Sequence, residues 1–289
     1  MCVPAPIFCS PLSKQAVDVF CGSTMPSVRT REMIQAELDY LDHLAKAGVR
    51  VARSLPSLAG QFVESVDTTH GTFHAVVFEG LVGKQFELEE LTPEMFTAWG
   101  KALGELHRAA QSYTAVGRST WRDLIEAAEE QPEVRQAAKQ LHRELAQLPI
   151  NNYQVKDNYG LTHFDFELDN LIWDGQRFGI LDFDDCVWHW YAADIAFALG
   201  DLFDDDAAKV DLSNPSFCAF IEGYRTAKPI ADDELARIPL FLRLDNSLVF
   251  CKLRRAADAG DQDDDPNWLK ELRQKLDRKM QRCLATLTQ

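Results

Sequence analysis

The chain has 289 residues, 46% of them hydrophobic, which is enough to bury the core of one large domain or of two lobes. Its formal net charge of −15 at pH 7 argues against a nucleic-acid-binding surface, which needs clustered Lys and Arg, but it would suit a cationic small molecule or bound metal ions. Seven scattered cysteines without CxxC spacing argue against a disulfide scaffold or a zinc site.

The N-terminal part of the chain is predicted to contain one helix and three short strands. Residues 1–27 show no clear hydrophobic period and are expected to be irregular. Apolar residues then recur at helical spacing in residues 27–49, where Gly48 is expected to end the helix. Runs of β-like composition follow at residues 49–55, 61–67 and 72–81.

The rest of the chain is predicted to be mainly helical. Helices are expected at residues 93–111, 122–148, 215–227, 233–258 and 266–287, and residues 160–183 have the pattern strand, loop, strand, turn, strand. We therefore predict an α+β fold with a small mixed N-terminal lobe (1–80) and a larger, mainly helical C-terminal lobe (81–289). No apolar run approaches the ~18 residues of a membrane span and no basic leader is present, so we expect a cytoplasmic protein.

One stretch carries a pattern typical of phosphoryl transfer. His163, Asp165 and Asn170 fit the spacing H-x-D-x-x-x-x-N, and Asp182 follows at the end of the strand ILDFDD, as in a kinase catalytic loop and its metal-binding aspartate. Such a reaction needs a carboxylate that orients the acceptor hydroxyl and takes its proton, which suits Asp165. It also needs oxygen ligands for Mg²⁺, which suits Asn170 and Asp182. The alternative is that these residues merely cap turns and end a strand.

A hairpin is expected to bring the two candidate metal ligands together. A tight turn around Asp174 and Gly175 between two short strands would place Asn170 and Asp182 at the same end. Apolar neighbours such as Leu171 and Ile180 would pack beneath them. This arrangement explains why acidic residues alternate with residues that favour a core.

The stretch from His163 to Asp182 resembles the catalytic loop and metal-site strand of the aminoglycoside phosphotransferase and choline kinase-like family, which has a bilobal protein-kinase-like fold. Weaker similarity extends over roughly residues 28–275, through AVVFEGLVG, WGKALGELHRA, WHWYAADIAFAL and FIEGYR. The resemblance implies that Asp165 is the catalytic base and that Asn170 and Asp182 hold Mg²⁺. It further implies that a hinge at residues 78–83 contacts the adenine of ATP, or the base of GTP; its core residues are Phe78, Glu79, Gly80 and Leu81.

The resemblance also suggests supporting roles, each with a plainer alternative. His163 would brace the catalytic loop by hydrogen bonds, and Asp194 would cap a helix and tie down that loop. Asp184 would touch metal or a cationic substrate, or else be a solvated loop acid. Glu37 would pair with a phosphate-binding lysine, or else be an exposed helix residue. His107 is expected to be a packed or capping histidine.

The N-terminal lobe departs from the kinase pattern. Counting back 15 to 20 residues from Glu37 reaches DVFCGSTMP, which contains no Lys or Arg, and Gly22 is the only glycine before Gly48. Either this region is truncated or altered, or nucleotide binding is degenerate. The alternative function is therefore a catalytically impaired kinase-like binding or regulatory protein. A metal-dependent hydrolase is a weaker alternative, because the His-rich ligand set is missing.

The expected acceptor is a hydroxyl of a small molecule, aminoglycoside-, choline-, amino-alcohol- or sugar-like. An aromatic run (188–191) and two acidic runs (201–206 and 258–265) would attract an ammonium group by charge and cation–π contact. The alternative is that the acidic runs are solvated loops. The predicted function is thus Mg²⁺-assisted transfer of the γ-phosphate of ATP to such a small molecule.

Overall fold

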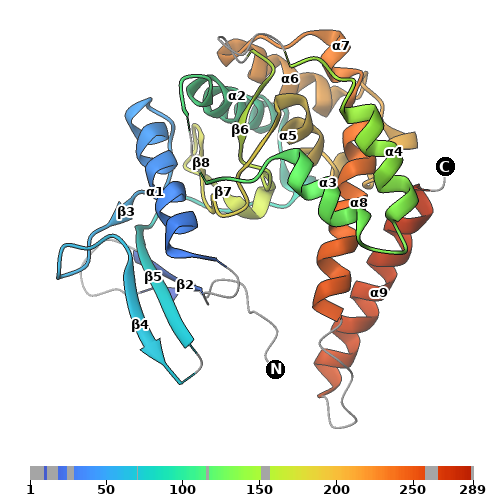
Figure 1. Cartoon of the computed structure of the whole chain (residues 1–289). Helices are drawn as coiled ribbons and strands as arrows, with labels where there is room; N and C mark the ends of the chain where they lie inside the picture. The colour runs from blue at the N-terminus through green and yellow to red at the C-terminus, as the bar shows by residue number, and fades with distance from the viewer. Residues whose placement is uncertain are drawn as a thin grey trace.

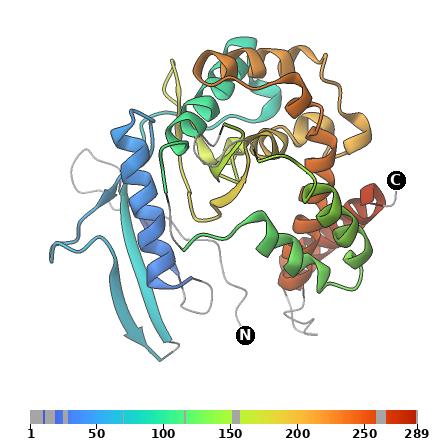
Figure 2. The same ribbon diagram turned by 45° about the horizontal axis from the view of Figure 1, so that its top comes forward.

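The computed structural model describes residues 10–11, 19–24, 29–69, 71–114, 117–150, 157–257 and 266–287 (Figure 1). Within them, an antiparallel sheet and one helix form the N-terminal part, and helices with two small two-stranded sheets form the rest (Figure 2). The prediction of a small mixed α/β part and a larger helical part is confirmed. The lobe boundary at residue 80 stays a prediction, although the chain leaves the sheet just before it, at Glu79.

The N-terminal sheet is built around β5 (Gly71–Glu79). Its antiparallel partners are β2 (Val19–Thr24), β3 (Ser54–Leu55) and β4 (Glu64–Thr68), and β1 (Ser10–Pro11) pairs with β2. The expectation that residues 1–27 are irregular is therefore wrong at β1 and β2. Six residues that include Gly22, Ser23 and Thr24 give no readable period, and the strand is specified by its pairing along β5 instead.

Helix α1 (Arg31–Lys46) forms where the apolar period predicted it. Thr30 caps its N-terminus, with the hydroxyl accepting the N–H of Met33 at 3.3 Å. The C-terminus closes through Gly48, whose φ of +87° suits a residue without a side chain. The hydroxyl of Tyr40 donates to the carbonyl of Leu161 at 2.8 Å, so α1 is anchored to the part of the chain that leads into the catalytic loop.

Helices α2 (Pro93–Ala110) and α6 (Pro215–Ala227) pack unusually closely. A Cβ added at Gly223 would overlap the carbonyl oxygen of Thr97, and one at Gly100 would overlap the carbonyl oxygen of Phe220. Glycine at both crossing points therefore allows the two backbones to touch.

The remaining helices within the described residues are α3 (Trp121–Glu129), α4 (Arg135–Leu145), α5 (Tyr191–Ala198), α7 (Asp232–Leu235), α8 (Ile238–Ala257) and α9 (Asn267–Leu287). Two predicted helices are in fact split. The 122–148 helix breaks around Pro132, and the 233–258 helix breaks ahead of Pro239, because proline removes a backbone donor and clashes with the preceding turn. Short 3₁₀ turns lie at Leu88–Glu90, Leu168–Asn170, Asp201–Phe203 and Ala207–Lys209.

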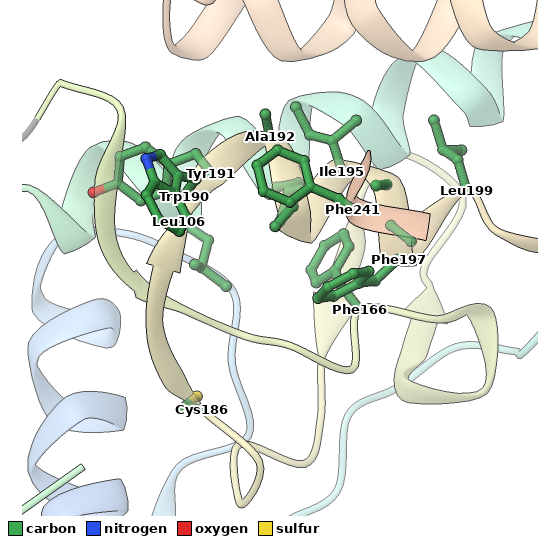
Figure 3. Packing of buried hydrophobic residues seen from close by; sticks show 14 of the residues in the cluster. Leu106, Phe166, Cys186, Trp190, Tyr191, Ala192, Ile195, Phe197, Leu199 and Phe241 are labelled. Atoms are coloured by element: carbon green, nitrogen blue, oxygen red, sulfur yellow. The ribbon is translucent and has the colours of Figure 1, made fainter. Parts of the chain in front are cut away.

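Four short strands surround the catalytic stretch. β6 (Tyr159–Thr162) pairs with β9 (Val187–Trp190), and β7 (Leu171–Trp173) pairs with β8 (Phe178–Ile180), both antiparallel. Figure 3 shows some of the buried hydrophobic residues of this region, among them Phe197 of α5 with Phe166 and Phe241. No helix among the described residues is long and apolar enough to cross a membrane.

Candidate active site

The catalytic loop follows β6 and brings the predicted base next to a predicted metal ligand. The side-chain amide Nδ2 of Asn170 donates to Oδ2 of Asp165 at 2.9 Å and to the carbonyl oxygen of Asp165 at 3.0 Å. The loop between them closes through the 3₁₀ turn, with the N–H of Asn170 bonded to the carbonyl of Glu167 at 3.1 Å. Asp165 and Asn170 are thus held as a contacting pair, five residues apart.

Asp194 fixes the start of this loop. Its carboxylate is fully buried and accepts the N–H of His163 at 2.9 Å and the N–H of Phe164 at 2.7 Å. Phe164 has a φ of +72°, a conformation that a phenylalanine holds only when its surroundings enforce it. Asp194 lies one turn inside α5 rather than at its N-cap, so the predicted capping role is wrong.

A buried histidine, His107 on α2, forms a hydrogen bond with Asp194. Nε2 of His107 lies 2.9 Å from Oδ2 of Asp194, and Nδ1 lies 2.9 Å from the hydroxyl of Tyr224. Burial acts to raise the pKa of Asp194, but the hydrogen bond and charge of His107 and the N–H of His163 outweigh it, so the pKa is lowered. The carboxylate therefore stays ionised.

The β7–β8 hairpin places Asp182 beside Asn170. Leu171 pairs with Ile180, and the N–H of Leu181 donates to the carbonyl of Asn170 at 2.9 Å. The turn is closed by Asp174, whose Oδ1 accepts the N–H groups of the two residues after Gly175 at 2.9 and 3.0 Å. The hairpin that the sequence predicted is therefore present in the structure.

His163 joins the catalytic loop to the strand end before Asp182. Its Nδ1 accepts the N–H of Asp165 at 3.3 Å, and its Nε2 lies 2.9 Å from the carbonyl oxygen of Leu181. One tautomer satisfies both contacts, with the proton on Nε2. The histidine thereby links the two segments that carry Asp165 and Asp182.

The acidic loop that begins at Asp182 is electrostatically crowded. Burial raises the pKa of the half-buried Asp184 to about 7, and the negative charges of Asp182 and Asp185 raise it further. Burial likewise raises the pKa of Asp165, against the opposing charge of Lys252. Carboxylates in this condition bind a proton or a cation readily.

The donor set fits a magnesium ion held largely by its substrate. No group of three or more His, Cys, Asp or Glu side chains within the described residues is arranged to hold a metal ion. Mg²⁺ needs no such cage, because it prefers hard oxygen ligands and takes only one or two carboxylates plus phosphate oxygens and water. Asp182 and the amide oxygen of Asn170 supply ligands of that kind.

Two cations that the sequence analysis missed hold the acidic loop. The guanidinium of Arg118 donates to the carbonyls of Phe183, Asp184 and Cys186 at 2.7, 2.9 and 3.0 Å. Nζ of Lys252, on α8, lies 2.6 Å from Oδ2 of Asp185. Both contacts join residues more than 60 positions apart, so no local pattern could have revealed them.

Among the described residues, the partner of Glu37 is an arginine rather than the predicted lysine, and the alternative that Glu37 is an exposed helix residue is wrong. It is buried on α1 and forms an ion pair with Arg29, which directly precedes the Thr30 cap. Nη1 of Arg29 also lies 3.6 Å from Oδ2 of Asp184. The one sequence signal for this pair is an arginine eight residues before the helix glutamate.

The predicted nucleotide hinge lies against the hairpin that carries Asn170 and Asp182. Its residues, Phe78, Glu79, Gly80 and Leu81, are half-buried at the end of β5. The guanidinium of Arg50 donates hydrogen bonds to the carbonyl oxygens of Val82 and Ile172, at 2.7 and 2.8 Å. Lys84 and Trp173 exchange two backbone hydrogen bonds at 2.8 and 2.9 Å. The segment after the sheet is thus fastened to β7.

The predicted aromatic wall of the acceptor site (188–191) is mostly buried, with Trp188 half-buried and the other three residues in the core. His189, Trp190 and Tyr191 are 2% exposed or less, so they belong to the core. A run of aromatic residues is more often buried than displayed, because each removes a large apolar area from water. Of the two acidic runs, the second (258–265) lies outside the described residues.

One residue of the first acidic run (201–206), Asp205, lies near an aspartate of helix α8 that interacts with the catalytic loop. Burial raises the pKa of the half-buried Asp245 on α8 to about 7, with the charges of Asp205 and Asp165 acting in the same direction. Burial also raises the pKa of Asp205. Lys279 and Lys252 oppose the shift of Asp245 without cancelling it, and Lys279 and Arg282 oppose that of Asp205. This side of Asp165 therefore carries carboxyl groups whose ionised forms are disfavoured by burial and by one another.

Comparison with known proteins agrees with this geometry. The sequence profile of the "Phosphotransferase enzyme family" matches residues 23–229. The chain belongs to this family. It is 31% identical over 248 residues to amicoumacin kinase of Bacillus subtilis (strain 168), covering 80% of this chain and 72% of that protein. The prediction of a small-molecule phosphotransferase is thereby confirmed.

Solved structures of the family share the fold. The amicoumacin kinase hAmiN, in complex with AMP-PNP, Ca²⁺ and Ami, superposes with a TM-score of 0.75 at 23% identity, covering 97% of this chain and 90% of that one. A microcompartment-associated aminopropanol kinase superposes with a TM-score of 0.71 at 22% identity, covering 99% and 91%. The protein-kinase-like fold is therefore confirmed.

Proposed function

We propose that the enzyme transfers the γ-phosphate of ATP to a hydroxyl of an amine-bearing small molecule, with Asp165 as the base. The observation that carries this proposal is the contact of Asp165 with Asn170 beside the hairpin end that bears Asp182. In the transfer, a bond forms between the acceptor oxygen and the γ-phosphorus, and the bond from that phosphorus to the bridging oxygen of ADP breaks. The acceptor proton passes to Asp165.

Asn170 and Asp182 would hold Mg²⁺, whose charge neutralises the phosphates. Asp165 orients the acceptor hydroxyl, and its raised pKa makes it a better proton acceptor than an ordinary aspartate. Phe78, Glu79, Gly80 and Leu81 would contact the adenine. His163 and Asp194 keep the loop in the conformation that presents Asp165.

The acceptor is proposed to be cationic because of the acids around Asp165. The pKa values of Asp245 and Asp205 are raised although Lys279 lies near both, and a bound ammonium group would favour the ionised forms of these carboxyl groups and be attracted to them. The curated relative that is 31% identical is named for a kinase reaction on amicoumacin. Aminoglycosides, amino alcohols and sugars are the other acceptors to compare with it.

ADP release tests the proposal, measured with Mg-ATP or Mg-GTP and a panel of amicoumacin, aminoglycosides, amino alcohols and neutral sugars. We expect ATP-dependent turnover with at least one amine-bearing acceptor. The Asp245→Asn variant should raise the KM for that acceptor about tenfold, the scale of one lost charged contact, while leaving the KM for ATP unchanged. Turnover of neutral sugars alone would contradict the cationic acceptor.

The rival function, a catalytically impaired binding protein, is separated from this one by the same assay combined with thermal unfolding. An active enzyme is stabilised by Mg-ATP and consumes it when the acceptor is added. A binding protein is stabilised without consuming ATP. If neither stabilisation nor ADP release occurs with any nucleotide, the proposed function is wrong.

A further inference from the structure

Arg29 lies between α1 and the acidic loop. It is 7% exposed, its Nη2 pairs with Oε2 of Glu37, and its Nη1 lies 3.6 Å from Oδ2 of Asp184. Burial acts to lower the pKa of Arg29, but the charges of Glu37, Asp184 and Asp182 outweigh it and raise the pKa. A single guanidinium therefore bridges the helix and the loop that carries a predicted metal ligand.

No cation from the neighbouring strand performs this task. The sequence of β2, VFCGST, contains neither lysine nor arginine. Glu37 is only 5% exposed, and a carboxylate at that depth needs a positive partner to stay ionised. Arg29 meets that need from the chain segment just before α1, which gives a guanidinium with several donors instead of the single point charge of a lysine.

The Arg29 guanidinium has one N–H donor that the contacts with Glu37 and Asp184 do not use. Nε of Arg29 is buried and has no hydrogen-bond partner among the residues that the structure describes. A buried donor without a partner costs free energy, and a bound ligand is one of the ways in which such a donor is satisfied. Its neighbours Asp184 and Asp182 mark the side on which metal and phosphates are proposed to bind.

We propose that Arg29 is a positioning residue for phosphoryl transfer: by pairing with Glu37 and contacting Asp184, it sets α1 and the acidic loop in the arrangement that nucleotide binding requires. The role corresponds to that of the strand lysine paired with a helix glutamate in protein kinases. This inference rests on the proposed function, ATP-dependent phosphoryl transfer. The alternative is that the Arg29–Glu37 ion pair only stabilises the fold.

Substitution of both partners by apolar residues separates the two possibilities. Removal of Arg29 alone leaves Glu37 buried without a partner and should destabilise the fold, so Arg29→Met by itself is ambiguous. The double variant Arg29→Met/Glu37→Met replaces the pair by residues of similar volume and is expected to recover most of the melting temperature. Arg31→Met is the matched control, because Arg31 is an exposed arginine two residues away.

We expect the double variant to melt near the wild-type temperature yet to have a kcat/KM for Mg-ATP lowered roughly 100-fold, as for a misplaced reacting group. The KM for the acceptor should change little. Arg29→Lys should recover part of the loss, because it restores the charge without the second donor. Arg31→Met should match the wild type. If the double variant recovers turnover together with stability, Arg29 is only structural and the proposal is wrong.

A binding measurement keeps this result distinct from failure of the proposed function. Thermal stabilisation by Mg-ATP is measured on the wild type, the double variant and Arg31→Met without any acceptor. Loss of the stabilisation in the double variant alone supports the proposal even if no acceptor is ever phosphorylated. Equal stabilisation in all three proteins would overturn the role of Arg29 and leave the proposed function standing, whereas no stabilisation of the wild type would overturn both.

Discussion

Nε2 of His107 lies 2.9 Å from Oδ2 of Asp194, and neither side chain is exposed to solvent. Through this pair α2 supports α5, and through the two N–H groups that Asp194 accepts, α5 supports the catalytic loop. The position of Asp165 is therefore determined by a buried polar network rather than by the loop itself. Such networks stabilise a structure only when every member has its partner.

Truncation of the Asp194 side chain should lower the free energy of unfolding, because it removes the centre of this hydrogen-bond network. Asp194→Ala removes the acceptor of two backbone N–H groups and of His107, and we expect a loss on the order of 3–5 kcal/mol in the free energy of unfolding. Asp194→Asn keeps one acceptor oxygen and should lose less. Denaturant unfolding measures both values. A loss below about 1 kcal/mol for Asp194→Ala would show that the network is not needed.

His189 should contribute a loss of stability in mild acid, opposite in sign to the contributions of Asp184 and Asp245, whose raised pKa values favour the folded state as pH falls. Burial lowers the pKa of this histidine from 6.5 to about 4. Between those values the unfolded chain binds a proton that the folded chain does not, so the free energy of unfolding decreases as pH falls from 6.5 to 4. The decrease from this residue is at most ~3 kcal/mol. Relative to the wild type, His189→Phe should become progressively more stable as pH falls from 6.5 to 4, measured by denaturant unfolding at each pH. An identical pH dependence of the two proteins would contradict the lowered pKa of His189.

The α2–α6 contact should not tolerate a methyl group. A Cβ at position 223 overlaps the carbonyl oxygen of Thr97, so the helices must separate. Gly223→Ala should cost ~1–3 kcal/mol in the free energy of unfolding, although alanine is the better helix former. Glu222→Ala, on the exposed face of the same helix, is the control and should be neutral or slightly stabilising. Equal stability of the two variants would contradict the close approach.

Nucleotide binding should depend on a divalent metal through Asp182. We expect chelation by EDTA to abolish the thermal stabilisation by ATP, and re-addition of Mg²⁺ to restore it. Asp182→Asn should raise the Mg²⁺ concentration needed at least tenfold, because one charged ligand is lost. Asp42→Asn, an exposed acid on α1, should behave as the wild type. If ATP stabilises the protein equally with and without divalent metal, Asp182 is not a metal ligand for nucleotide binding.

Local features of the site could be predicted from the sequence. Asp165 and Asn170 lie in one short loop, and the hairpin that follows leads from Asn170 to Asp182. The turn residues Asp174 and Gly175 predict that hairpin, so these positions follow from local sequence patterns. The same holds for α1, whose apolar period and terminal Gly48 are local features.

Contacts between distant segments could not be predicted. Arg118 and Lys252 reach the acidic loop from other parts of the fold, and a single sequence contains no record of such pairings. Helix α5 was missed because all eight of its residues are buried, so it lacks the apolar period that identifies a surface helix.

The most direct test of the proposed chemistry is single-turnover transfer by Asp165→Asn. The variant keeps the size of the side chain but removes the carboxylate that is proposed to accept the acceptor proton. We predict that Mg-ATP still stabilises it against heat, while transfer of phosphate to the acceptor falls by roughly 100-fold or more, as expected for loss of a general base. Asp42→Asn should transfer at the wild-type rate. Transfer by Asp165→Asn within a few-fold of wild type would contradict the account.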